Sequence, residues 1–277
     1  MKNKKVLNIA KEVIKLELTS LKKLQSSIGK SFEQIVKTIL NCKSGKVIIS
    51  GVGKSGIIGK KWSATLSSTG TPSFFLDASN ASHGDMGQIS SNDILILISH
   101  SGETNELKNI IQFASRNKKI VLIGITSKKN SLLYRNSNIN LQLPEVSEAD
   151  PAHIVPTSST IVQLSIGDAL AVACMRARRF GKLDFKKFHP SGNLATKLKT
   201  VEDLMIKGNK IPFIDENSTM KNALRILSKK NLGVLIIRNK TKKTIGVITD
   251  GDLKRAIEKK NNIKDIKLKK IMTKNPI

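Results

Sequence analysis

Apolar residues follow two patterns along this chain: one has helical spacing, and the other consists of short continuous runs. Residues 5–42 carry them at helical spacing, as at Val6, Ile9, Phe32 and Ile35, which predicts two amphipathic helices. Five short apolar runs follow, each bounded by turn residues, at positions 47–49, 74–76, 94–98, 120–125 and 139–143. Stretches of helical character lie between and after these runs, at positions 55–68, 104–114 and 157–179.

Short apolar runs that alternate with helices are typical of buried parallel strands. The pattern therefore predicts an α/β fold with a doubly wound sheet of five parallel strands. The N-terminal helices are expected to pack on this sheet or on another subunit. In such folds the ligand site lies at the C-terminal ends of the strands.

The pattern changes near Asp203, where a small β/α module begins. It predicts a helix with Ala223 and Leu227, strands at 234–237 and 245–249 joined by a turn, and a second helix. We therefore expect three regions: N-terminal helices at 1–44, a sheet domain at 45–200 and a smaller region at 201–277.

The charge and aromatic content of the chain indicate which class of partner it binds. The net charge of +27 would suit nucleic acid, but the excess is mostly Lys, is spread along the chain, and comes with one Trp and one Tyr. Without an aromatic platform, an anionic substrate explains the charge at least as well. We therefore expect no nucleic acid partner.

No run of eighteen apolar residues occurs, and the N-terminus alternates charged with apolar positions, so we expect no membrane span and no signal peptide. Cys42 and Cys174 lie far apart with no C-x-x-C spacing, which is typical of a thiol-reducing compartment. The expected location is the cytoplasm.

The stretch GVGKSG, residues 51–56, follows the first predicted strand and precedes a helix, which is the arrangement of an anion-binding loop. A nucleotide-triphosphate loop fails because Ile48 stands where its leading glycine belongs. A dinucleotide site stays open, with Asp77 as the ribose-binding acid. So does a phosphosugar site, in which Lys54 is a charged donor.

A second candidate loop, ISHSGET at residues 98–104, follows the third predicted strand. Ser99, Ser101 and Thr104 supply three hydroxyls around Gly102 where a helix begins, whereas an ordinary helix cap needs one. Two anion-holding loops at adjacent strand ends favour a single phosphate monoester over an extended dinucleotide.

Histidines and glutamates supply the candidate proton carriers. His83, Asp85, His153 and His189 could gather at a metal, but no H-x-x-x-H or C-x-x-C spacing supports one, so we expect no metal. His100 and His153 are interpreted as structural. Glu103, in the second loop, is expected to turn away from a bound phosphate. That leaves three candidate acids or bases, Glu106, Glu145 and Glu148.

Read together, GVGKSG, STGTPSFFLDASNASHGDMG, SHSGETNEL, PTSSTIVQLSIGDALAVA and FHPSGNLATKL resemble the arabinose 5-phosphate isomerase family, in order and spacing, from about residue 45 onward. The family has a sugar isomerase (SIS) domain followed by cystathionine-β-synthase (CBS) motifs. The resemblance implies interconversion of D-arabinose 5-phosphate and D-ribulose 5-phosphate, which feeds 3-deoxy-D-manno-octulosonate synthesis for lipopolysaccharide or capsule. It also removes the dinucleotide interpretation.

The resemblance implies a set of site residues and no cofactor. The catalytic residues it implies are Lys54, Glu106, Glu148 and His189, and those for the phosphate are Ser55, Ser99, Ser101 and Thr104. Further substrate contacts are expected at Gly53, His83, Thr157 and Ser158. In related enzymes the histidine reaches in from a neighbouring subunit, so His189 implies a homo-oligomer, expected to be a tetramer.

The chemistry gives these residue types a reason. The C2 proton must leave, a cis-enediol must be stabilised, and a proton must return to C1. Glu148 is the expected carrier, with a pKa raised by a dry pocket. Lys54 would neutralise enediolate charge, His189 would assist ring opening, and Glu106 would orient Lys54 or join the relay.

The chain departs from the family in two places. His100 stands where the family usually has Asn. One CBS motif is complete near residues 206–260, and a second opens at IKLKKIMTKNPI but is cut short at Ile277, as in a fragment or a shortened form. A complete pair forms a nucleotide-sensing cleft, so the incomplete pair argues against regulation by a nucleotide. Two alternatives stay open: a non-catalytic phosphosugar sensor, and an isomerase of another sugar phosphate.

Overall fold

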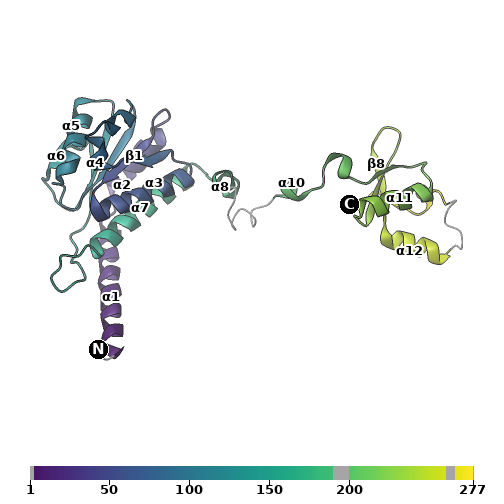
Figure 1. Cartoon of the computed structure of the whole chain (residues 1–277), viewed down its shortest axis with the longest axis horizontal. Coiled ribbons are helices and arrows are strands. Elements are labelled where there is room, and N and C mark those ends of the chain that lie inside the picture. The colour runs from purple at the N-terminus through teal and green to yellow at the C-terminus, as the bar shows by residue number, and fades with distance from the viewer. Residues whose placement is uncertain (1–2, 190–199, 260–265, 277) are drawn as a thin grey trace. The chain divides into compact units, whose positions relative to one another are not determined.

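The computed structural model describes residues 3–189, 200–259 and 266–276 (Figure 1). They form two compact units, residues 1–198 and 199–277, and each is described by itself. The motif residues from Pro190 to Leu198, which the sequence places beside His189, lie outside the described residues.

The first unit is built on a five-stranded sheet with strand order β2-β1-β3-β4-β5. All four pairings between neighbouring strands are parallel, which confirms the predicted doubly wound α/β fold. The strands are β1 (Val47–Gly51), β2 (Ser73–Phe75), β3 (Ile94–Ile98), β4 (Val121–Thr126) and β5 (Ile139–Gln142). The order reverses between β1 and β3, and ligands of such sheets bind at this switch point.

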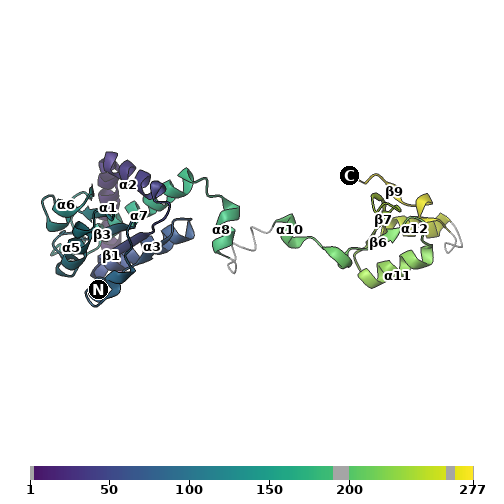
Figure 2. The ribbon, with the colours of Figure 1, turned by 90° about the horizontal axis from the view of Figure 1, so that it is seen from above.

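Helices cover both faces of the sheet (Figure 1, Figure 2). One layer holds α1 (Asn3–Ser27), α2 (Lys30–Asn41), α3 (Gly53–Ser68) and α7 (Ser158–Ala177). The opposite layer holds α4 (Ala78–Ala81), η1 (Asp85–Gln88), η2 (Asn105–Leu107), α5 (Lys108–Arg116) and α6 (Leu132–Asn136), and α8 (Lys182–Phe188) follows α7. Because side chains alternate along a strand, Ile96 joins the core under α7 while Leu95 joins the core under α5. Two-sided burial explains the continuous apolar runs.

Helix α7 is long and apolar enough to cross a membrane by length and composition alone. Half of its apolar stretch is buried inside the unit, where α7 packs against α1, α2 and α3. The indole of Trp62 donates to the backbone carbonyl of Gln163 at 2.9 Å, and a Cβ on Gly167 would meet the same indole at 2.0 Å. This close approach requires glycine at position 167. The apolar side chains of α7 are explained by their packing in the core.

The second unit has a sheet of order β6-β7-β8-β9 around its own core. Its elements are α10 (Val201–Leu204), η3 (Gly208–Lys210), β6 (Phe213–Asp215), α11 (Met220–Lys230), β7 (Val234–Arg238), β8 (Thr244–Thr249), α12 (Asp250–Lys259), η4 (Leu268–Lys270) and β9 (Thr273–Lys274). The predicted helix-strand-strand-helix order is confirmed. The segment interpreted as the opening of a second motif adds β9 to the edge of this sheet, where Thr273 pairs with Val247. Its identity as a second CBS motif stays a prediction.

Candidate active site

A cavity of about 410 Å³ opens where the chain leaves β1 and β3. Its lining includes six residues that the sequence singled out: Lys54, Ser55, Ser99, Ser101, Thr104 and Glu148. They come from the loop after β1, the loop after β3 and the segment before α7. The tertiary structure therefore gathers the two expected anion loops and a carboxylate around one space, of a size typical for small-ligand sites.

The first loop ends β1 and starts α3 with almost no linker. Gly53 is the first residue of α3 and has a φ of +58°, a conformation that favours glycine. Lys54 and Ser55 therefore lie in the first turn, where backbone N–H groups have no partner within the helix and the helix dipole is positive. Asp77, once a candidate ribose ligand, caps α4 by accepting the Ser79 N–H at 2.9 Å.

The second loop is folded tightly by its own hydroxyls. Ser99 is buried and hydrogen-bonds the Thr104 hydroxyl at 2.8 Å, and it accepts the Gly102 N–H at 3.0 Å. Gly102 has a φ of +69°, and a Cβ there would meet Ser131 Oγ at 2.1 Å. Glu103 turns away as expected, because its Oε1 accepts the Leu132 N–H at 2.7 Å. The carboxylate is thus removed from the side where an anion would bind.

Glu148 lies in the segment between β5 and α7 and contacts the start of that helix. Its Oε2 accepts the Thr157 N–H at 2.8 Å, the Thr157 hydroxyl at 3.1 Å and the Ser159 N–H at 3.3 Å. A carboxylate at a helix N-terminus is favoured by the helix dipole as well as by these donors. The helix therefore fixes the position of Glu148 at the cavity wall.

These contacts correct one expectation from the sequence, that the pKa of Glu148 is raised. Burial by itself would raise the pKa of this carboxyl, but hydrogen bonds from Ser159 and Thr157 outweigh it and hold the pKa below its ordinary value. The expectation took account of the dry pocket alone, because the donors at the start of α7 are not visible in the sequence. Glu148 is therefore ionised at neutral pH.

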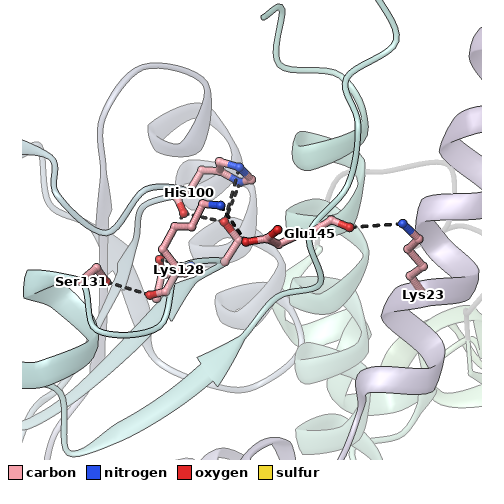
Figure 3. A network of polar contacts seen from close by, with 7 residues as sticks. Lys23, His100, Lys128, Ser131 and Glu145 are labelled. Carbon is pink, nitrogen blue, oxygen red and sulfur yellow. Dashed lines mark hydrogen bonds and ion pairs between the residues drawn. The ribbon is translucent and has the colours of Figure 1, made fainter. Parts of the chain in front are cut away.

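A polar network borders the cavity at His100 (Figure 3). The ring of His100 lies 3.4 Å from Ser127 Oγ, and Lys128 pairs with Glu145 at 2.6 Å. Lys23, on α1, donates to the backbone carbonyl of Glu145 at 3.4 Å. The pKa of Glu145 is lowered by the Lys128 hydrogen bond and charge, and further by the charge of His100. Glu145, weighed with Glu148 as a proton carrier, is thus engaged in an exposed ion pair.

His153, interpreted as structural, also lines the cavity. Its Nδ1 lies 2.7 Å from the backbone carbonyl of Glu148, and because a carbonyl oxygen only accepts, Nδ1 carries the proton in this contact. The residue has a φ of +56°. No motif marks this position, because its place depends on the fold of the loop before α7.

Other predicted residues do not line the cavity. Glu106 and His83 are exposed on η2 and beside α4. His189 Nδ1 lies 2.9 Å from the Phe185 carbonyl and its ring stacks on Phe185. Gly53 contributes backbone at the helix start, as described above. The roles expected for these four residues stay predictions.

Helix α7 contributes different residues from those that the sequence indicated. Thr157 uses its N–H and hydroxyl on Glu148, and Ser158 is fully buried away from the cavity lining. Ser159, Thr160 and Gln163 line the cavity instead. Positions three and four apart share one face of a helix. Once the start of α7 is known, this spacing predicts that Ser159, Thr160 and Gln163 face the same side.

Over residues 3–189, 200–259 and 266–276, the structure places no group of three or more His, Cys, Asp and Glu side chains where it could hold a metal. The groups that line the cavity offer the chemistry of hydroxyls, an amide, a lysine, a carboxylate and the imidazoles of His100 and His153.

Two protein families match the chain: the SIS domain over residues 39–173 and the CBS domain over residues 201–259. Arabinose 5-phosphate isomerase KdsD of Francisella tularensis is 43% identical over 274 residues, which cover 98% of this chain and 83% of that protein. The KdsD protein of Salmonella typhimurium is 39% identical over 95% of this chain and 80% of its own length. A solved Escherichia coli structure, described as a complex with arabinose 5-phosphate, is 37% identical with a TM-score of 0.66, covering 69% of this chain and all of that one.

Proposed function

We propose that this chain, which belongs to the arabinose 5-phosphate isomerase family, interconverts D-arabinose 5-phosphate and D-ribulose 5-phosphate. It is an aldose–ketose isomerase with a SIS domain and a CBS region. Its product would feed the synthesis of 3-deoxy-D-manno-octulosonate. A non-catalytic sensor is less supported, because the two KdsD relatives, at 43% and 39% identity, are named as isomerases.

The observation that carries this proposal is the pairing of two anion loops with one fixed carboxylate around a single cavity. Ser55, Ser99, Ser101 and Thr104, with the first N–H groups of α3, would hold the 5-phosphate. Holding the ester at one end leaves the other end of a five-carbon chain to extend along the cavity wall. Glu148 belongs to that wall, which supports its assignment to the reacting carbons.

We assign the proton transfer to Glu148. The hydrogen bonds from Thr157 and the Ser159 N–H described above fall on Oε2, so Oε1 is the oxygen proposed to take the C2 proton of the open-chain aldose. Removal of that proton gives the cis-enediolate, and return of a proton to C1 gives the ketose. Lys54 would stabilise the negative charge on the enediolate oxygens. An ionised carboxylate in contact with the substrate is the form that a base requires.

We also propose a homo-oligomer, a tetramer as in the implied family arrangement, in which His189 enters the cavity of a neighbouring subunit and assists ring opening. In this chain His189 is not part of the cavity lining, which agrees with a contribution in trans. The N-terminal turns of α1 project beyond the body of the first unit in Figure 1, and Leu7, Ile14 and Leu18 on them are 55–61% exposed. This apolar stripe would be covered by a second copy. Free Cys42 and Cys174 support a cytoplasmic location.

The proposal is tested by incubating the purified chain with D-arabinose 5-phosphate and following D-ribulose 5-phosphate by NMR. Pentose and hexose phosphates of other configuration are offered as alternative substrates in parallel reactions. We expect turnover with the arabinose compound and its ketose only. Binding without turnover of any sugar phosphate would favour the sensor, and preferred turnover of another sugar would favour the second alternative.

A further inference from the structure

Gln163 is a cavity residue that the mechanism above does not use. It lies on α7, lines the cavity and is 1% exposed. Within the part of the chain that the structure describes, its side-chain Oε1 has no hydrogen-bond partner. A buried amide oxygen without a partner is costly, so such groups in folded proteins call for an explanation.

The hydrogen bond that ties this part of α7 to α3 does not use the side chain of Gln163. The contact that anchors the helix here uses the backbone carbonyl of Gln163, which accepts the Trp62 indole N–H at 2.9 Å. Gly167, one turn further on, lies directly against the same indole. The backbone at Gln163 is thus held rigidly while its amide oxygen is left unpaired, which is the arrangement of a preorganised binding group.

The position of the amide indicates what it could bind. Gln163 follows Ser159 by four residues, so the two side chains are neighbours on one face of α7. The Ser159 N–H contacts Glu148, the proposed base, whereas the hydroxyls assigned to the phosphate come from the loops after β1 and β3. Gln163 therefore belongs to the wall beside the reacting carbons. A carboxamide both donates and accepts, which suits a sugar hydroxyl.

We propose that the side-chain amide of Gln163 hydrogen-bonds a hydroxyl of the sugar's carbon chain and thereby selects among sugar phosphates. This inference rests on the proposed function, because it assumes a phosphosugar in the cavity. A site built to pair with a substrate hydroxyl rejects analogues that lack it, since its own buried polar group is then left unpaired.

The test uses Gln163→Met, which keeps the length of the side chain and removes its polar atoms. Gln112→Met, on the exposed side of α5, is the matched control. Dissociation constants for D-arabinose 5-phosphate and for inorganic phosphate are measured by calorimetry. We expect Gln163→Met to weaken sugar phosphate binding about three- to tenfold, as for one neutral hydrogen bond, with inorganic phosphate binding unchanged. Its melting temperature should be equal or higher, because an unpaired polar group has been removed.

Deoxy analogues complete the test. 2-Deoxy-D-ribose 5-phosphate and the 3-deoxy and 4-deoxy analogues of D-arabinose 5-phosphate each lack one hydroxyl, and one of them should lose affinity for the natural chain but not for Gln163→Met. Equal losses for both proteins with every analogue would overturn the proposal. So would a lowered melting temperature with unchanged sugar binding, because Gln163 would then serve the fold. Calorimetry does not need turnover, so failure of the proposed isomerase activity is recognised separately.

Discussion

The carboxylate of Glu148 accepts the backbone N–H of Thr157 at 2.8 Å, one residue before α7 begins. A side chain from an irregular segment is thereby fixed to the N-terminal end of α7, a helix that packs against α1, α2 and α3. The contact positions the proposed base and lowers its pKa at the same time. Several measurable properties depend on it.

Replacing Glu148 by Gln should lower kcat at least about a hundredfold while substrate binding is retained. The amide keeps the size of the side chain and can still accept from Thr157, but it cannot take a proton from C2. Steady-state kinetics with D-arabinose 5-phosphate measures the effect, and Glu145→Gln, in the exposed ion pair, is the control. Near-normal turnover in Glu148→Gln would move the base elsewhere, to Glu106 first.

The lowered pKa of Glu148 makes a prediction about acid pH. A base works only when ionised, so kcat, which reports groups in the enzyme–substrate complex, should fall only as pH drops through a value below the ordinary 4.5 of a glutamate. Thr157→Val removes the hydroxyl that donates to Oε2, and it should move this acid limb to higher pH. If the acid limb of the natural chain's kcat profile lay near pH 6, the raised pKa of Glu148 that the sequence suggested would be correct.

Ser101→Ala should raise KM for the sugar phosphate with little change in kcat. The Ser101 hydroxyl lines the cavity beside Thr104, and a contact to the phosphate is made equally in the ground state and the transition state. We expect a loss of about tenfold, as for a hydrogen bond to a charged group. Ser26→Ala, on the exposed face of α1, serves as the control. An unchanged KM would contradict the second anion loop.

Sharing of the site between subunits can be tested by complementation. His189→Ala and Glu148→Gln should each be inactive alone, yet co-expressed chains should recover activity in mixed oligomers. If each site takes its histidine from one neighbour, random mixing restores roughly a quarter of the natural activity. Mass spectrometry shows whether the oligomers contain both variants. If mixed oligomers recover no activity, His189 acts in the cavity of its own chain or takes no part in the reaction.

Asp93 provides a stability prediction away from the cavity. The side chain is 1% exposed and accepts the Lys46 ammonium and the Ser90 N–H, each at 2.8 Å. Asp93→Ala would leave these donors unpaired and should lower the free energy of unfolding by about 2 kcal/mol. Urea titration followed by the fluorescence of Trp62, the one tryptophan, measures it.

The effect of Asp93 should depend on pH. Burial by itself would raise the pKa of Asp93, but the hydrogen bonds from Lys46 and Ser90 lower it overall. Because the folded pKa lies below the unfolded one, the stabilisation is complete above the ordinary value of 3.8 and is lost as pH falls through the folded pKa. The difference between natural chain and variant should therefore shrink at pH 3, and a constant difference would contradict this account.

The sheet and its helices were predictable because their signals are local. Strands buried on both faces, such as β3, must be apolar throughout, and α5 must carry an apolar stripe. Turn chemistry at Gly53 and Gly102 likewise fixed where the two anion loops lie. The short elements β6 and β9 were missed because neither is a continuous apolar run: β6 ends in Asp215 and β9 is Thr273–Lys274.

The amino-acid sequence alone thus determined the fold class, the two loops and the family to which the chain belongs. The tertiary structure decided how the segment before α7 folds onto that helix. Only this packing supplies the donors that lower the pKa of Glu148 and turns Gln163, rather than Ser158, toward the cavity. The physical reason is that a pKa or an unpaired amide oxygen depends on atoms brought together from distant parts of the chain, whereas a strand or a helix depends on its own residues.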